Sequence, residues 1–189
     1  RLLLVPVVAL SFSLSPKWTP AWFALATLSD FFDGYWARKW HVTSDFGAFL
    51  DPVADKLLVS TSLIALSAQY GMVVAWPSAV IIAREVAVSA LREWMAQRQL
   101  RDMVQVSWQG KVKTACTMVA LFVMLCALAV SSSKDMAVSS SIRLWQTSVT
   151  LLYASAILTV TSGAAYFRAA ASALMAPPRK RLHKTSYQP

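Results

Sequence analysis

Long apolar stretches separated by short polar connectors dominate the chain. A membrane-spanning helix needs roughly 20 mostly apolar residues, and six segments approach that length: 2–14, 21–40, 46–68, 76–97, 112–130 and 142–167. No internal repeat or second domain interrupts this pattern. The sequence therefore predicts an all-α integral membrane bundle of six transmembrane helices over residues 1–175, followed by a basic, disordered tail at 176–189.

The composition agrees with a membrane as the solvent. Hydrophobic residues make up 57% of the 189 positions and charged residues 14%, which lies outside the usual range of soluble proteins. Lys and Arg outnumber Asp and Glu by 18 to 9. In so apolar a chain, this surplus indicates contact with anionic lipid rather than with nucleic acid. The chain opens at Arg1 without an initiator Met, so we expect a truncated N-terminus.

Basic residues gather on one predicted side of the membrane. They flank the connectors after the second and fourth segments and fill the tail, whereas the opposite connectors hold little beyond Lys17 and Lys134. The positive-inside tendency makes the basic face cytoplasmic, or stromal or matrix-side in an organelle. We expect a multi-pass protein of a bacterial inner membrane, or of a plastid or mitochondrial inner membrane, with its active site on that side.

Four aspartates lie inside these apolar segments, where an unpaired charge costs about 3 kcal/mol or more. Asp30 and Asp33 are three apart on the second segment, and Asp51 and Asp55 are four apart on the third, so each pair shares a helix face. Antiparallel packing of the two segments would bring the four carboxylates together. Hard divalent cations that take oxygen ligands would remove their repulsion. The alternative is an ion-pair network that merely holds the bundle together.

Small and basic residues accompany these acids at fixed spacing. The run DFFDGYWARKWHVTSDFGAFLDPVAD, residues 30–55, has the form D, two residues, DG, two residues, AR, eight residues, G, three residues, D, three residues, D. This pattern resembles, without departure, the signature of the CDP-alcohol phosphotransferase family. The resemblance implies six transmembrane helices, often assembled as a homodimer, with a site that opens at the cytoplasmic interface.

The resemblance also implies roles for the residues of this signature. Two divalent metal ions, Mg²⁺ or Mn²⁺, would be bound by Asp30, Asp33, Asp51 and Asp55. Asp55 would in addition be the catalytic base toward the hydroxyl of the acceptor. The CDP group would be bound by Asp30, Gly34, Ala37, Arg38 and Gly47.

Three runs, the first of which extends the signature, are similar to those of the phosphatidylglycerophosphate synthases within that family: FGAFLDPVADKLLVS, IIAREVAVSALREW and SWQGKVKTA. Their substrates are CDP-diacylglycerol and sn-glycerol 3-phosphate. A phosphate on the acceptor requires cations nearby, and we predict that they are Arg84, Arg92, Lys111 and Lys113. Inositol phosphate would require the same cations, so these residues alone do not separate the two acceptors. Glu85 and Glu93 directly follow the two arginines and are interpreted as salt-bridge partners.

Several alternatives stay open at this point. Inositol phosphate, serine or phosphatidylglycerol as the acceptor would keep the fold and the chemistry. An acidic cluster within the membrane would also suit a cation carrier, although a carrier gives no reason for the spacing of DG, AR and G. A catalytically silent scaffold would keep the fold but would not need all four aspartates. Cys116 and Cys126 lie in an apolar run and are interpreted as buried apolar side chains, and no spacing of His and Cys predicts a zinc site.

Overall fold

Six α-helices make up the chain in the computed structural model, which describes residues 2–40, 45–98, 108–132 and 138–175. At some helical positions, among them Asp30, Asp33, Arg38, Asp51 and Lys111, it describes the backbone alone. The helices are α1 (Leu4–Leu14), α2 (Thr19–Trp40), α3 (Asp45–Tyr70), α4 (Met72–Gln97), α5 (Trp108–Ser131) and α6 (Val138–Met175), with a short 3₁₀ turn, η1 (Pro16–Trp18), between the first two. The predicted all-α architecture is confirmed.

The helix ends follow the apolar segments closely, with one clear exception at the C-terminal end of α6. The apolar run was expected to end at residue 167, but α6 continues to Met175 and is 38 residues long. The added turns are rich in alanine, which has the highest intrinsic helix propensity and loses no side-chain entropy in a helix. Helix formation therefore outlasts the apolar pattern here. The proposed tail at 176–189 lies outside the described residues.

Three helices of the described chain are long and apolar enough to cross a membrane by themselves, namely Met72–Gln97, Val112–Ser131 and Ile142–Ala171. The first helix, Leu4–Leu14, is apolar but short. α2 and α3 contain 22 and 26 residues, which is sufficient length for a bilayer, and they carry the four aspartates of the signature. The membrane character of the chain is thus clear, while the spanning of all six helices stays a prediction.

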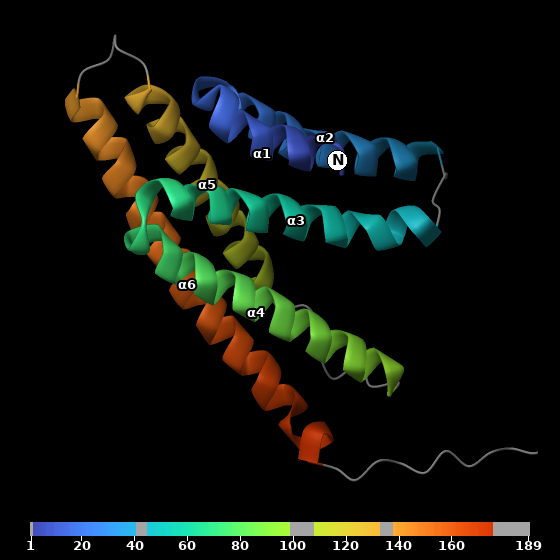
Figure 1. Cartoon of the computed structure of the whole chain (residues 1–189). Coiled ribbons are helices and arrows are strands. Elements are labelled where there is room, and N and C mark those ends of the chain that lie inside the picture. Colours follow the sequence, from blue (N-terminus) through green and yellow to red (C-terminus); the bar gives the residue numbers. More distant parts are fainter. Residues whose placement is uncertain (1, 41–44, 99–107, 133–137, 176–189) are drawn as a thin grey trace, which may run out of the picture.

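The helices pack as an antiparallel bundle in which α5 and α6 form the most extensive pair. α4 packs against both α3 and α6, and α1 packs against both α2 and α3 (Figure 1). One apolar cluster joins them, with fully buried side chains such as Leu63 and Leu66 of α3, Leu121 of α5 and Leu152 of α6. A second, smaller cluster lies between α4 and α6 and includes Met95 and Tyr166.

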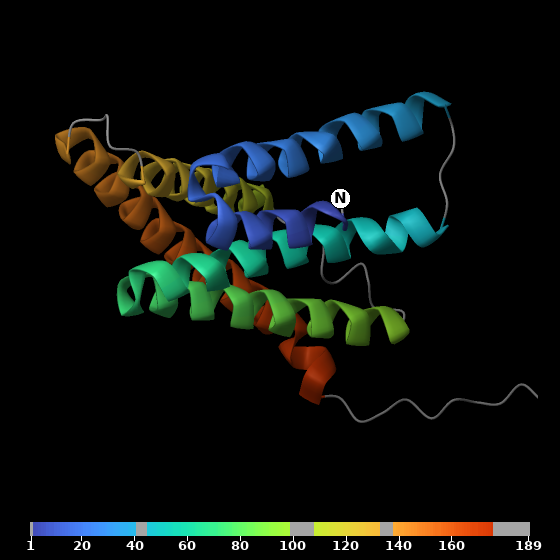
Figure 2. The same ribbon diagram turned by 45° about the horizontal axis from the view of Figure 1, so that its top comes forward.

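The antiparallel order brings particular helix ends together. The C-terminal end of α2 and the N-terminal end of α3 lie at the same side of the molecule, as Figure 2 shows, and the C-terminal end of α4 points the same way. α3 and α4 are joined at the opposite side by Gly71, whose φ of 67° and ψ of −150° belong to a region that only glycine adopts without strain. The acid-bearing ends of α2 and α3 therefore lie on the same side as the C-terminal end of α4 (Figure 2).

Candidate active site

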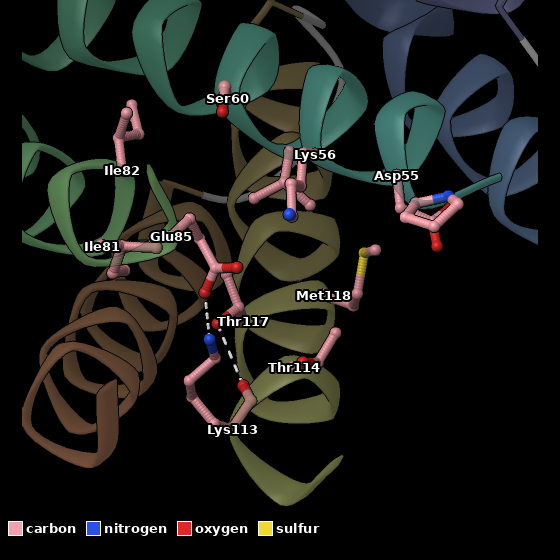
Figure 3. A pocket seen from close by; sticks show the side chains of 12 residues that line it. Asp55, Lys56, Ser60, Ile81, Ile82, Glu85, Lys113, Thr114, Thr117 and Met118 are labelled. Atoms are coloured by element: carbon pink, nitrogen blue, oxygen red, sulfur yellow. Dashed lines mark hydrogen bonds and ion pairs between the residues drawn. The ribbon is translucent and has the colours of Figure 1, made fainter. Parts of the chain in front are cut away.

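A cavity of about 210 Å³ lies between α3, α4 and α5. Its walls are formed by one face of each helix, because the lining positions recur three or four residues apart. Figure 3 shows side chains from all three helices directed at this space. The lining residues are Pro52, Asp55, Lys56, Val59 and Ser60 of α3, Ile81, Ile82 and Glu85 of α4, and Lys113, Thr114, Thr117 and Met118 of α5.

Asp55 is the signature aspartate whose side chain the structure describes, and it lines the cavity. The α3 backbone is helical from Asp45 onward and the α2 backbone is helical up to Trp40, so Asp51 and Asp55 lie one turn apart on α3. Asp30 and Asp33 are likewise neighbours on α2. α2 and α3 run antiparallel, with α1 packed against both. The side chains of the other three aspartates lie outside the described positions, so the convergence of the four carboxylates stays a prediction.

Lys113 is the most buried charged residue among the described side chains, with 4% of its surface exposed. Its Nζ donates a hydrogen bond to Glu85 Oε1, which joins α5 to α4 (Figure 3). An ammonium group buried in an apolar bundle without a partner would be strongly destabilising. Glu85 supplies that partner, and both groups face the same cavity as Asp55.

Arg84 points away from this cavity toward α6. Its Nη2 donates a 2.9 Å hydrogen bond to Ser162 Oγ, and its guanidinium carbon lies 5.6 Å from the centre of the Tyr166 ring, a cation–π distance. A Cβ at Gly163 would come within 3.1 Å of Arg84 Cγ, so the glycine makes room for the arginine side chain. Arg84 also contacts the neighbouring carboxylate, with Nη1 3.3 Å from Glu85 Oε1.

The four predicted acceptor residues are therefore not brought to one place among the described side chains. Lys113 lines the cavity, whereas Arg84 lies at the interface of α4 and α6. Arg92 is exposed and does not line the cavity, because seven residues of helix carry it about 10 Å along the axis from Glu85, the last residue of α4 in the cavity wall. The side chain of Lys111 lies outside the described positions.

The interpretation of the two glutamates as ion-pair partners holds for Glu85, which pairs with Lys113 across helices. Glu93 instead accepts a 3.4 Å hydrogen bond from Gln97 one turn later. Cys116 and Cys126 are free and partly buried on α5.

Besides Glu85, four polar residues of the cavity wall were not singled out from the sequence as site residues: Lys56, Ser60, Thr114 and Thr117. Lys56 directly follows Asp55 and donates a hydrogen bond to Ser89 Oγ of α4. Thr114 and Thr117 follow Lys113 at spacings that place them on the cavity side of α5. Thr117 Oγ1 donates to the Lys113 carbonyl at 3.0 Å and also bonds Ser155 Oγ of α6. The sequence could have identified them because each lies next to a predicted site residue or between one and two helical turns further along.

The carboxylates of the signature suit a hard divalent cation, since Mg²⁺ and Mn²⁺ prefer oxygen ligands. Within the described part of the chain, no group of three or more candidate ligands is found, and only Asp55 of the four aspartates contributes a described side chain there. Asp55 lines the cavity between α3, α4 and α5. Binding of a divalent cation by the four aspartates therefore stays a prediction.

Comparison with known proteins assigns the chain to a family. The family model for CDP-alcohol phosphatidyltransferases matches residues 1–173. The chain belongs to the CDP-alcohol phosphatidyltransferase family, as the signature at 30–55 predicted.

Its relatives include proteins named CDP-diacylglycerol–glycerol-3-phosphate 3-phosphatidyltransferase. The protein of that name from Sodalis glossinidius is 46% identical over 130 residues, which cover 66% of this chain and 71% of the relative. The Pectobacterium atrosepticum protein is 48% identical with the same coverage. The Escherichia coli K12 protein is 48% identical over 126 residues, which cover 64% of this chain and 69% of the relative.

Proposed function

We propose that the chain is a phosphatidyltransferase that converts CDP-diacylglycerol and sn-glycerol 3-phosphate to phosphatidylglycerophosphate and CMP. This places it in the synthesis of phosphatidylglycerol and cardiolipin. The family assignment and the names of the relatives support this reaction. The single observation that carries it is that Asp55, the base implied by the signature, and Lys113, a cation suited to a phosphate, line one cavity.

Lys113 and Asp55 act on opposite ends of the acceptor. Lys113 binds the phosphate of glycerol 3-phosphate, which holds the far hydroxyl of the acceptor toward Asp55. The Asp55 carboxylate takes the hydroxyl proton as the acceptor oxygen forms a bond to the phosphorus that bears diacylglycerol. The bond from that phosphorus to the CMP oxygen breaks, and CMP leaves with the electron pair. Positioning matters here because a carboxylate is a weak base toward an alcohol.

The signature residues bind the donor. Asp30, Asp33, Asp51 and Asp55 would hold two divalent ions, Mg²⁺ or Mn²⁺, which when bound neutralise the pyrophosphate and stabilise departing CMP. Gly34, Ala37 and Gly47 let the cytidine nucleotide approach the helix backbones, while Asp30 and Arg38 bind the CDP group. Arg84, Arg92 and Lys111 remain candidates for contacts to the acceptor.

Other features of the proposal concern the membrane. We expect the site to open on the cytoplasmic side of a bacterial inner membrane, as the bacterial sources of the relatives suggest, or on the stromal or matrix side of an organelle membrane. We also expect a homodimer and a cationic tail at 176–189 that contacts anionic lipid. A phosphatidyltransferase with inositol phosphate as the acceptor is the second candidate, because Lys113 would serve its phosphate equally well.

An acceptor panel tests the proposed reaction. The purified protein in detergent, supplied with CDP-diacylglycerol and Mg²⁺, is expected to release CMP with glycerol 3-phosphate and much less with inositol phosphate, serine, phosphatidylglycerol or no acceptor. Asp55→Asn is expected to abolish that release. Release with another acceptor alone would keep the family chemistry but overturn the substrate. Metal transport across sealed vesicles without consumption of CDP-diacylglycerol would favour the carrier.

A further inference from the structure

The ammonium group of Lys113, which is proposed to bind the acceptor phosphate, is already paired with a carboxylate of the protein. Lys113 Nζ is hydrogen-bonded to Glu85 Oε1, and both side chains line the cavity that Asp55 also lines. A phosphate that binds Lys113 must therefore compete with the Glu85 carboxylate for the same ammonium group. A phosphate monoester carries nearly two negative charges at neutral pH, so its attraction to the ammonium exceeds that of a carboxylate at equal distance.

Glu85 has a second partner that does not line the cavity. Arg84 Nη1 lies 3.3 Å from the same carboxylate oxygen that Lys113 contacts. The arginine is fixed on α6 by the hydrogen bond to Ser162 Oγ and by the Tyr166 ring, and it fits there because residue 163 is glycine. When a phosphate takes Lys113, Glu85 keeps Arg84 as its counter-ion. The exchange thus leaves no carboxylate buried without a partner, which would otherwise be costly.

We propose that Glu85 is a built-in competitor for the phosphate of the acceptor: its carboxylate neutralises Lys113 while the cavity is empty, gives way to the phosphate when the acceptor binds, and returns to Lys113 when the product leaves. This inference rests on the proposed function, since it takes Lys113 as the phosphate-binding group. The product, phosphatidylglycerophosphate, carries the same phosphate as the acceptor. A site that bound this phosphate without competition would also retain the product, so Glu85 weakens acceptor binding and product retention together.

Glu85→Gln tests the competition, because it removes the charge and keeps the shape of the side chain. We expect KM for glycerol 3-phosphate to fall roughly fivefold, the size typical of losing one partly exposed ion pair, with KM for CDP-diacylglycerol unchanged. Binding of inorganic phosphate, measured by calorimetry on the detergent-purified protein, should tighten by a similar factor. Glu93→Gln is the matched control on the same helix, where Glu93 is exposed and contacts Gln97, and it should change neither value.

The direction of the change separates the competitor from a mere positioning residue. If Glu85 only held Lys113 in place, Glu85→Gln would raise KM and weaken phosphate binding, and either that result or no change would overturn the proposal. In a Lys113→Gln background, Glu85→Gln should no longer affect phosphate binding, and a persisting effect would show that Glu85 does not act through Lys113. Glu85→Asp, whose carboxylate reaches less far, should shift KM in the same direction by less and serves if the glutamine variant does not fold.

Failure of this proposal can be told from failure of the proposed function. If the wild-type protein releases no CMP with glycerol 3-phosphate, the reaction is wrong. The calorimetric comparison of wild type and Glu85→Gln with inorganic phosphate still decides whether Glu85 competes at Lys113. If the wild type is active and the variant binds phosphate more weakly, the reaction stands and the competition is refuted.

Discussion

The donor half and the acceptor half of the proposed site are built in different ways. The signature places all its acids on α2 and α3 within residues 30–55, on two helices that follow each other directly. The acceptor side is assembled from three helices. Lys113 and Glu85 are 28 positions apart, and Arg84 and Ser162 are 78 apart. The donor half is therefore encoded by local spacing, whereas the acceptor half exists only once α4, α5 and α6 have packed.

The local spacing of the donor half and the assembly of the acceptor half from separate helices both suit the proposed reaction. In the proposed reaction, a short rigid spacing on two adjacent helices suffices to present acids to the pyrophosphate of the donor. The proposed acceptor contacts come from separate helices, so each can be changed without altering the signature. Substitutions in the two halves should accordingly affect different kinetic parameters.

The largest effect is expected in the donor half, at the point where it meets the cavity. Asp55→Asn removes the proposed base and a metal ligand, so CMP release should fall by about a hundredfold or more. The assay is CMP release with saturating glycerol 3-phosphate, and Glu93→Gln, an exposed change on α4, is the control. Activity within tenfold of wild type would remove Asp55 from the chemistry.

Lys113→Gln should have the next largest effect, and it should be confined to the acceptor. Loss of a charge-assisted hydrogen bond to phosphate costs about 1.5–3 kcal/mol, so KM for glycerol 3-phosphate should rise roughly 10- to 100-fold. KM for CDP-diacylglycerol should stay within twofold, as initial rates at varied concentrations of each substrate would show. Lys17→Gln, on the 3₁₀ turn between α1 and α2, is the control. An increase confined to KM for CDP-diacylglycerol would contradict the division into two halves.

A smaller effect is expected where the side chain of Arg84 packs against α6. Gly163→Ala places a Cβ 3.1 Å from Arg84 Cγ, and this overpacking should lower the free energy of unfolding by about 1–2 kcal/mol. Gly71→Ala offers a matched control: nothing lies within 4 Å of its Cβ, but its positive φ should make alanine destabilising by about 1–3 kcal/mol. Thermal unfolding measures both losses.

Only the Gly163 variant should also shift KM for glycerol 3-phosphate, because only that glycine lies against a partner of Glu85. We expect a shift of about twofold, since Arg84 is one residue removed from the cavity. Equal KM values in Gly163→Ala and Gly71→Ala would mean that Arg84 does not influence the acceptor side.

The smallest effect is expected at the hydrogen bonds that join α5 to α6. Thr117→Val keeps the shape of the side chain but removes its bonds to the Lys113 carbonyl and to Ser155 Oγ. Such bonds between membrane helices contribute about 0.6 kcal/mol on average, so the melting temperature should fall slightly. Thr150→Val is the control, because Thr150 is exposed and bonds only the Gln146 carbonyl of its own helix. A loss as large in the control would show that the α5–α6 bond contributes nothing.

The fold was largely predictable because length and apolarity alone determine where helices form in a membrane. The predicted segments ended where α1, α2 and α4 end. The C-terminal turns of α6 were missed, since they depend on the helix propensity of alanine and not on an apolar run. We expected all six helices to span the membrane, whereas three helices in the described chain are long and apolar enough to do so.

The candidate site was predictable only in part. The signature identified Asp55 because its spacing is local, and Lys113 was expected beside it because a phosphate needs a cation. The orientation of Arg84 toward α6 depends on Ser162, Gly163 and Tyr166, and no local pattern relates residues so far apart. The proposed role of Glu85 depends on two cations that contact one of its oxygens, which becomes visible only in three dimensions.

The most direct test of the central claim is the transfer of labelled glycerol 3-phosphate into lipid. The purified protein in liposomes that contain CDP-diacylglycerol and Mg²⁺ should convert radiolabelled glycerol 3-phosphate to phosphatidylglycerophosphate, with one CMP released per labelled lipid formed. Labelled lipid in that ratio, absent with Asp55→Asn, is the result that the proposed function predicts. CDP-diacylglycerol left intact, or consumed only with inositol phosphate or serine, would contradict it.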